Sequence, residues 1–439
     1  MRTVMIFVWG LFFTNVCSAQ PKVWSLNDCI DHALQHHIGI RQRELTCKKQ
    51  EIQLSTDKNS RLPNLDASLG QNFSFGRGLG ADNTYTNTNT SNTSLNLGTS
   101  VPLFTGFRIP RQVKLDELNL EALSQDLQKA KDDVSVQVAK AYVQVLYNRE
   151  MVGVAQRQVA IDSQQVARMQ AMKDNGKASE VQLAQQKAAL AQSRLTATQA
   201  DNNLQLALLD LSQLLELSSA EGFDVEVPVL GELTRQEVPA PMTVFDEAMG
   251  YKAEVKAEQL RLRASEMGIQ LAQSGYYPQL SLSAGLGTNY YKTSGFKSGS
   301  LANQLKNNFS QYVGLSLSVP IFNRFYTRNS VRSARIDREN QLLALDNVKK
   351  TLYKEIQTVC CNAEAAQTKL KSSEEALNSS EEAFRLMQAK YENGKANITE
   401  FNESKNSLLK AQSDLVQARY EYCYQKALVN FYCGRPITF

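Results

Sequence analysis

The chain has 439 residues, with 48 basic and 44 acidic side chains and a formal net charge of +4. This near balance, without a basic cluster, argues against a nucleic-acid partner. The three histidines, His32, His36 and His37, lie together near the N-terminus, and no Gly-rich phosphate loop or nucleophile elbow is present, so we expect no enzyme and no cofactor.

The first residues have the pattern of an export signal. Arg2 supplies a positive charge, Val4 to Phe13 is apolar apart from Gly10, and Ala19 is a small residue suited to cleavage before Gln20. The apolar run, about ten residues, is too short to cross a bilayer as a helix. We therefore expect residues 1–19 to be a signal peptide, with lipidation at Cys17 as the less favoured alternative. Beyond it no long apolar stretch follows, so the chain is expected to be periplasmic, secreted or a β-barrel of an outer membrane.

Residues 65–75 alternate between an apolar face and a polar face, which is the signal of a β-strand. Residues 95–101 repeat the alternation as a partner strand, and residues 280–287 and 313–319 form a second such pair. The strands are about ten residues long, which suits a tilted crossing of a bilayer. Their polar faces are almost entirely Ser, Gly and Asn, so we favour membrane strands around a wet lumen over two soluble hairpins.

Four strands cannot close a membrane barrel, because lipid tolerates no unpaired strand edges and the smallest such barrels have about eight strands. The strands must therefore be pooled between protomers. Two copies would give a barrel filled by its own side chains, whereas three would give twelve strands and a channel. The small lumen-facing residues favour three. The polar segments 76–93 and 288–308 are expected to be external loops, with Tyr290 and Tyr291 at the headgroup belt.

Each strand pair is followed by a very long helix pattern, at residues 106–172 and 324–391. In the first, apolar residues recur at a four-three spacing, interrupted by Asn148 and Asp162. A helix of this length would extend about 100 Å. Each long helix meets an Asn-Gly-Lys turn and is followed by a return helix. We expect antiparallel helical hairpins that project from the membrane into the periplasm around the lumen axis.

The chain is an internal duplication. Asn175-Gly176-Lys177-Ala178 returns verbatim at 393–396, an offset of 218 residues. Other landmarks recur at nearly the same offset, which implies two homologous halves. The expected division is a first repeat at 20–216, a linker at 217–242, a second repeat at 243–433 and a tail at 434–439. The linker and tail are expected to form a collar with the N-terminus. Six cysteines remain after cleavage, all on helix-like stretches, and their pairing cannot be read from the sequence.

These phrases together resemble the TolC-like outer membrane factor family. The resemblance covers the whole mature chain and rests on the opening WSLNDCI, on RLPNL and YYPQL before the strands, on VPLFTGF and VPIFNRF after them, and on the two NGKA turns. It implies a homotrimer with a twelve-stranded barrel in the outer membrane of a Gram-negative bacterium, continued by a periplasmic α-helical coiled-coil barrel. Such a protein is the passive exit duct of a tripartite efflux pump or a type I secretion system, with a periplasmic adaptor and an inner-membrane transporter as partners.

The resemblance also implies functional residues at the helix-turn tips. Glu400 and Glu403 match the acidic positions that ring the tunnel entrance, and Tyr391 matches a gate tyrosine. This constriction would favour cations. The family's frequent arginine is replaced here by Ala396, and Gln182 stands where the family often has Asp, so the gate contacts are expected to differ, with Lys177 and Lys395 as candidate substitutes. Adaptor docking is expected at the tips, centred on Asn175, Gly176, Lys177, Asn393, Gly394 and Lys395.

Two alternatives stay open at this stage. A periplasmic coiled-coil adaptor or scaffold without a channel would explain the helices but leaves the four alternating strands unexplained. A dedicated secretion duct cannot be separated from a drug-efflux duct, because the inner-membrane partner selects the cargo. The transported substrate, the identity of the partners, the disulfide state and the resting state of the tip are not fixed by the sequence. The spacing of Cys29, His32 and His36 suits a metal, but no fourth ligand is near, and we expect no metal site.

Overall fold

The order of the helices and strands repeats itself, as the duplication predicts. The computed structural model describes residues 23–79, 84–219, 222–228, 238–295 and 297–438, so the expected signal peptide and part of the linker lie outside the described residues. The first repeat contains α1 (Leu26–His36), α2 (Ile38–Asn59), β2 (Asn64–Leu79), β3 (Tyr85–Phe104), α3 (Arg108–Asp174) and α4 (Glu180–Leu214). The second contains α5 (Pro241–Tyr251), α6 (Ala253–Gln273), β5 (Gln279–Thr293), α7 (Leu301–Asn307), β6 (Ser310–Ser318), α8 (Tyr326–Glu392) and α9 (Ile398–Tyr432).

The described residues divide into two compact units, each built from both repeats. One unit is drawn from Gln42–Lys129 and Met249–Leu352 and contains the four-stranded sheet. The other is drawn from Met1–Arg41, Ala130–Ala248 and Tyr353–Phe439 and contains the helix-turn tips.

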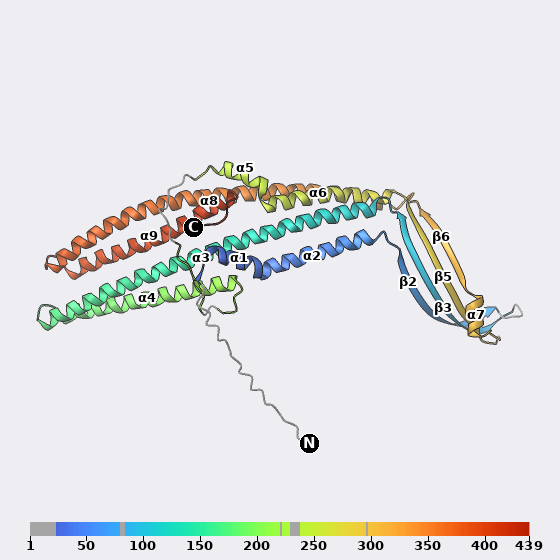
Figure 1. The fold of residues 1–439 in the computed structure, drawn as a ribbon, viewed down its shortest axis with the longest axis horizontal. Coiled ribbons are helices and arrows are strands. Elements are labelled where there is room, and N and C mark those ends of the chain that lie inside the picture. Colours follow the sequence, from blue (N-terminus) through green and yellow to red (C-terminus); the bar gives the residue numbers. More distant parts are fainter. Residues whose placement is uncertain (1–22, 80–83, 220–221, 229–237, 296, 439) are drawn as a thin grey trace, which may run out of the picture. The chain divides into compact units, whose positions relative to one another are not determined.

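The sheet of the first unit is antiparallel, in the order β2-β3-β5-β6, so β2 and β6 form its edges (Figure 1). The register places residues of one kind in rows across it. Leu65, Thr99, Ala284 and Val313 form one such row on the apolar face. On the edge strands, side chains of this face are strongly exposed, 71% for Leu65 and 78% for Val313, whereas Thr99 and Ala284 on the central strands are half-buried. The opposite face carries Ser, Gly and Asn, with Tyr312 as a large exception whose ring covers Gly285. The sheet thus has an exposed apolar face and a small-residue polar face.

Three of the strands are longer than the sequence suggested, while β6 has 9 residues. β2 has 16, β3 has 20 and β5 has 15. The segment expected as an external loop at 76–93 is mostly strand, because β3 begins at Tyr85 and pairs with β2 as far as Leu79. Its alternating Thr and Asn read as loop composition, but β-branched Thr is well suited to a strand. The second expected loop also contains structure, since β5 extends to Thr293 and α7 follows with Ser300 as its N-cap.

The second unit contains two helical hairpins of matched length. The full α3 and α8 each have 67 residues, and the return helices α4 and α9 each have 35 (Figure 1). Buried residues follow the expected seam of α3, including Val134, Val138 and Val145. The two interruptions of that seam, Asn148 and Asp162, are also buried, at 8% and 1% exposure. The Asn148 side chain donates a hydrogen bond to the Asn203 carbonyl of α4 at 3.1 Å, so this interruption holds the hairpin together.

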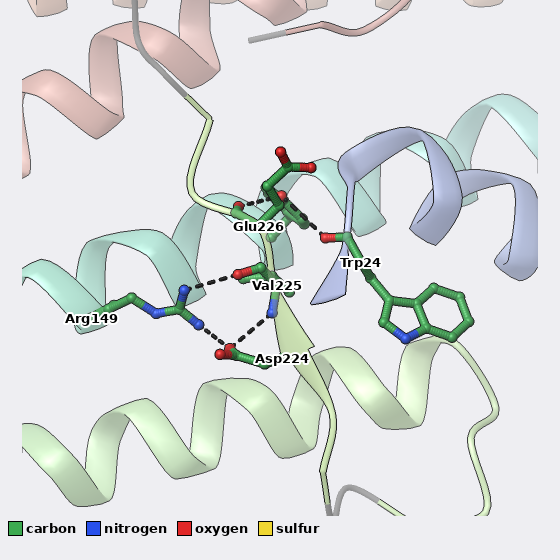
Figure 2. Close-up of polar contacts among 6 residues, drawn as sticks. Trp24, Arg149, Asp224, Val225 and Glu226 are labelled. Carbon is green, nitrogen blue, oxygen red and sulfur yellow. Dashed lines mark hydrogen bonds and ion pairs between the residues drawn. The ribbon is translucent and has the colours of Figure 1, made fainter. Parts of the chain in front are cut away.

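The N-terminus and the linker, two of the three segments expected to form a collar, meet in a short parallel pair of strands. β1 (Val23–Trp24) pairs with β4 (Asp224–Val225). Figure 2 shows Arg149 of α3 reaching this pair: its guanidinium donates to the Val225 carbonyl at 2.8 Å and to the Asp224 carboxylate. The buried Tyr142 hydroxyl, also from α3, donates to the Glu226 carbonyl at 2.6 Å. Two side chains of the long helix therefore fix the linker strand.

Candidate functional site

The two helix-turn tips have the same backbone. Gly176 and Gly394 both have φ of 70°, in the left-handed region that favours glycine. In each turn the following lysine N–H bonds back to a helix carbonyl at 2.8 Å, Lys177 to Met172 and Lys395 to Lys390. The asparagine before each glycine also bonds back: Asn175 donates to the Ala171 carbonyl and Asn393 to the Ala389 carbonyl, both at 2.7 Å. The repeated Asn-Gly-Lys is thus a helix stop, in which Asn and Gly have defined structural roles.

Both return helices begin with a capping box. Ser179 caps α4, and Gln182 accepts from the Ser179 N–H at 2.9 Å. Asn397 caps α9, and the Glu400 carboxylate accepts from the Asn397 N–H at 3.1 Å. Such reciprocal bonds satisfy backbone donors that a helix start would otherwise leave without a partner. Glu400 therefore has a structural role as well as a charge.

The three residues expected at the constriction lie near one tip, in different environments. Glu400 and Glu403 are both exposed on the first turns of α9. Tyr391 is half-buried, and its ring stacks on Phe401 with centroids 4.8 Å apart. Burial raises the pKa of the Tyr391 hydroxyl, an effect that the nearby Arg168 guanidinium opposes. Tyr391 thus belongs to an aromatic contact beneath the tip, whereas the two glutamates are open to solvent.

Arg168 connects the two hairpins, and sequence reasoning did not identify it. It comes from α3, and its guanidinium lies 5.4 Å from the centre of the Tyr391 ring on α8. The same side chain forms an ion pair with Glu392 at 3.6 Å. Arg168 thus places an arginine of the first hairpin beside two residues at the end of α8. No pattern in the sequence pointed to Arg168, and the substitute role expected for Lys177 and Lys395 stays a prediction.

A second connection between the hairpins is a buried ion pair that sequence reasoning also missed. Lys405 Nζ of α9 lies 2.5 Å from Asp162 Oδ1 of α3. Their side chains are 5% and 1% exposed. Asp162 also accepts hydrogen bonds from Ser193 of α4 and from Gln158. The interruption of the apolar seam at Asp162 was a visible signal, but its partner lies on a helix of the other repeat.

Neither a metal-binding cluster nor a disulfide bond is found among the described residues. His32 and His36 stack on one another with ring centroids 4.0 Å apart, and the described residues contain no group of three or more His, Cys, Asp and Glu side chains suited to a metal ion. The six described cysteines are free thiols. Among the helices within the described ranges, none has the length and hydropathy needed to cross a membrane.

Comparison with known proteins identifies the family of this chain. The profile of the family described as "Outer membrane efflux protein" matches residues 29–216 and 244–432. The chain is 22% identical over 342 residues to "Pyoverdine export outer membrane protein OpmQ" of Pseudomonas putida, an alignment that covers 77% of this chain and 69% of that protein.

Solved structures with the same fold include two outer membrane proteins. VceC of Vibrio cholerae superimposes with a TM-score of 0.77 at 19% identity, covering 94% of this chain and 97% of that one. The open state of the Neisseria gonorrhoeae MtrE outer membrane channel gives a TM-score of 0.75 at 18% identity, covering 94% and 89%. The expected α+β fold, with a sheet and long helical hairpins in two repeats, is confirmed. The chain therefore belongs to the outer membrane efflux protein family, a family of channel proteins of the outer membrane that act as conduits and not as enzymes.

Proposed function

We propose that three copies of this chain pool their sheets into one twelve-stranded barrel, and that their hairpins continue it as a tunnel on the periplasmic side. This trimer would be the passive exit duct of a tripartite efflux pump or type I secretion system. The channel function follows from the family, whereas the trimer and its partners are the proposal. A periplasmic scaffold without a channel is not compatible with membership of an outer membrane channel family.

The proposal rests on the four-stranded sheet, which has two edge strands, β2 and β6, and two dissimilar faces. Its apolar face is exposed, as lipid-facing residues such as Leu315 (66% exposed) and Leu69 (72%) would require. In lipid, the outer edges of β2 and β6 would need partners, because each unsatisfied backbone group there costs several kcal/mol. Joining β2 of one protomer to β6 of the next satisfies both edges. The Ser, Gly and Asn face then lines a wet lumen.

At the other end of the duct, the tips are proposed to form the entrance. Three copies of Glu400 and Glu403 around one axis would place six carboxylates at a constriction, which favours cations. Tyr391 would support this ring from below through Phe401, the neighbour of Glu400 in sequence. The turns at Asn175-Gly176-Lys177 and Asn393-Gly394-Lys395 are exposed, and the alanine that follows each turn is half-buried. These turns are proposed to dock the helical hairpins of a periplasmic adaptor. An inner-membrane transporter would supply energy and select the cargo.

The oligomeric state is tested by native mass spectrometry of the full-length protein purified in detergent. Signal-peptide cleavage is read from the same protomer mass. The proposal expects a trimer as the dominant species, with no smaller species at equilibrium. A dominant monomer or dimer in several mild detergents would contradict the shared twelve-stranded barrel.

A further inference from the structure

The buried ion pair between Lys405 and Asp162 belongs to a polar cluster that links three helices, α3, α4 and α9. Asp162 of α3 contacts Lys405 of α9 through Oδ1, at 2.5 Å. Its other oxygen, Oδ2, accepts from Gln158 at 3.0 Å and from the Ser193 hydroxyl of α4. Both oxygens of the carboxylate are thus engaged, and the first hairpin is linked to the return helix of the second.

Burying two charges is costly unless they are paired, and an apolar pair of similar size is often equally stable. Such a pair is therefore better understood as fixing one arrangement than as adding stability. The best-documented use of a buried polar group in a helical bundle is to set register. Lys405 and Asp162 are suited to this, because they belong to different hairpins.

Close packing does not fix α9 at this place. A cavity of about 330 Å³ lies beside the ion pair, between α3, α4 and α9. Its lining mixes polar and apolar side chains, and it includes Asn402, whose Oδ1 is buried without a hydrogen-bond partner within the described part of the chain. A tightly packed seam would restrict rotation of α9 by steric contact alone. Here the ion pair supplies a specific link where packing is incomplete.

Helix geometry relates the ion pair to the two glutamates. With about 100° of rotation per residue, Glu403 lies about 160° around the helix from Lys405, and Glu400 about 140°. Phe401, one turn before Lys405, lies on the buried side and is 0% exposed. Phe401 stacks on Tyr391 of α8 and so fixes α9 within its own hairpin. Lys405 instead fixes α9 against the first hairpin, which directs Glu400 and Glu403 away from the packed seam.

We propose that Lys405 and Asp162 are positioning residues for the acidic constriction: their ion pair holds α9 so that the carboxylates of Glu400 and Glu403 face the tunnel axis. This inference rests on the proposed role of those glutamates. It assigns a function to two residues that do not themselves touch the permeating ion.

The test compares cation-to-anion permeability ratios, obtained from reversal potentials of the purified protein in planar bilayers under a KCl gradient. Lys405→Met removes one positive charge, so electrostatics alone would raise cation selectivity. Loss of positioning should instead lower it several-fold, toward the value of the Glu400→Ala/Glu403→Ala double variant. Lys405→Arg, which keeps the charge and can reach the same carboxylate, should retain the wild-type ratio.

A second variant is needed because Lys405→Met alone leaves the buried Asp162 carboxylate without its cation, and the protein could misfold for that reason. Asp162→Asn/Lys405→Met removes both charges and leaves the net charge unchanged, so electrostatics alone predicts no change in selectivity. We expect the same several-fold loss. The matched control is Lys369→Met, which breaks the exposed 2.8 Å ion pair of Lys369 with Glu421 between α8 and α9 and should leave the ratio unchanged.

The outcomes separate this inference from the proposed function. If the Glu400→Ala/Glu403→Ala variant loses selectivity but Asp162→Asn/Lys405→Met retains it, the positioning role is wrong and the constriction stands. If the glutamate variant itself retains wild-type selectivity, the constriction is wrong and the positioning role is wrong with it.

Discussion

Gln182 and Glu400 occupy equivalent positions in the two repeats and make the same hydrogen bond, each accepting from the backbone N–H of the residue three positions earlier. One side chain is neutral and the other is charged. The duplication has therefore kept the cap in both hairpins but placed the carboxylate only in the second. At this position the cap and the charge can be separated by experiment.

Glu400→Gln should keep the cap and remove the charge, because glutamine closes the same capping box at Gln182. We expect a clear fall in cation selectivity, deeper when Glu403→Gln is added, with trimer thermal stability unchanged. Reversal potentials in planar bilayers measure the first quantity and thermal denaturation the second. Glu180→Gln, at the equivalent first turn of α4, is the control and should not change selectivity. Full selectivity in the Glu400→Gln/Glu403→Gln variant would remove both residues from the constriction.

The tip glycines should matter for docking and not for assembly. Gly394→Ala forces a left-handed backbone on a residue with a Cβ, at a cost of roughly 1–2 kcal/mol, although no side chain would be contacted. We expect the turn to shift and complementation by the adaptor to weaken, with trimers intact. Gly394→Asn should be milder, because asparagine tolerates this conformation. Normal complementation by both Gly176→Ala and Gly394→Ala, scored as efflux-dependent growth, would place the docking surface elsewhere.

The two faces of the sheet should respond oppositely to substitution. Leu282 shares its face with Val101 and Leu315, and Ser283 shares the other with Ser100 and Gly314. Leu282→Lys should impair barrel assembly, since a lysine facing lipid costs up to about 2–4 kcal/mol, depending on its depth in the bilayer. Ser283→Asn should be tolerated in a wet lumen. Heat-resistant trimer on a gel, after expression at equal levels, measures both. The reverse pattern would invert the assignment of lipid and lumen faces.

The linker strand should lose stability without the tyrosine that holds it. Tyr142→Phe removes the hydroxyl that donates to the Glu226 carbonyl at 2.6 Å, in a side chain only 2% exposed. Loss of this hydrogen bond costs about 0.5–1.5 kcal/mol, so we expect a lower midpoint of thermal unfolding. Tyr147→Phe, a hydroxyl removal on the same helix, serves as the control and should have a smaller effect. Equal midpoints for both variants would show that the contact contributes little.

Much of the fold could be predicted from the sequence, because strands and helices differ in the spacing at which apolar residues recur. Alternation identified all four strands of the sheet, and the heptad pattern with its Asn-Gly-Lys stops identified both long hairpins. The extent of β3 was missed, since Thr86 to Thr90 has the composition of a loop and only pairing with β2 reveals a strand. The capping boxes at Ser179 and Asn397 were not predicted, although Ser179 and Gln182 have the residue types and spacing of one.

The contacts between hairpins could not be predicted in the same way. Asp162 stood out as an interruption of an apolar seam, yet its partner Lys405 lies 243 positions further along the chain. Arg168 and Tyr391 meet only because two helices of different repeats pack together. Periodicity says which side of a helix is buried, but not which residue of another helix lies opposite. The family resemblance supplied the positions of Glu400 and Glu403, and not the pair that is proposed to direct them.

A membrane channel made by several copies of this chain should be detectable by single-channel recording of the purified full-length protein in a planar bilayer. We predict discrete conductance steps of uniform size, from a channel that is selective for cations. The steps should be given by the purified trimer and should be lost when the trimer is dissociated into monomers. A detergent-soluble protein that inserts no discrete conductance, at any concentration or polarity, would contradict the duct.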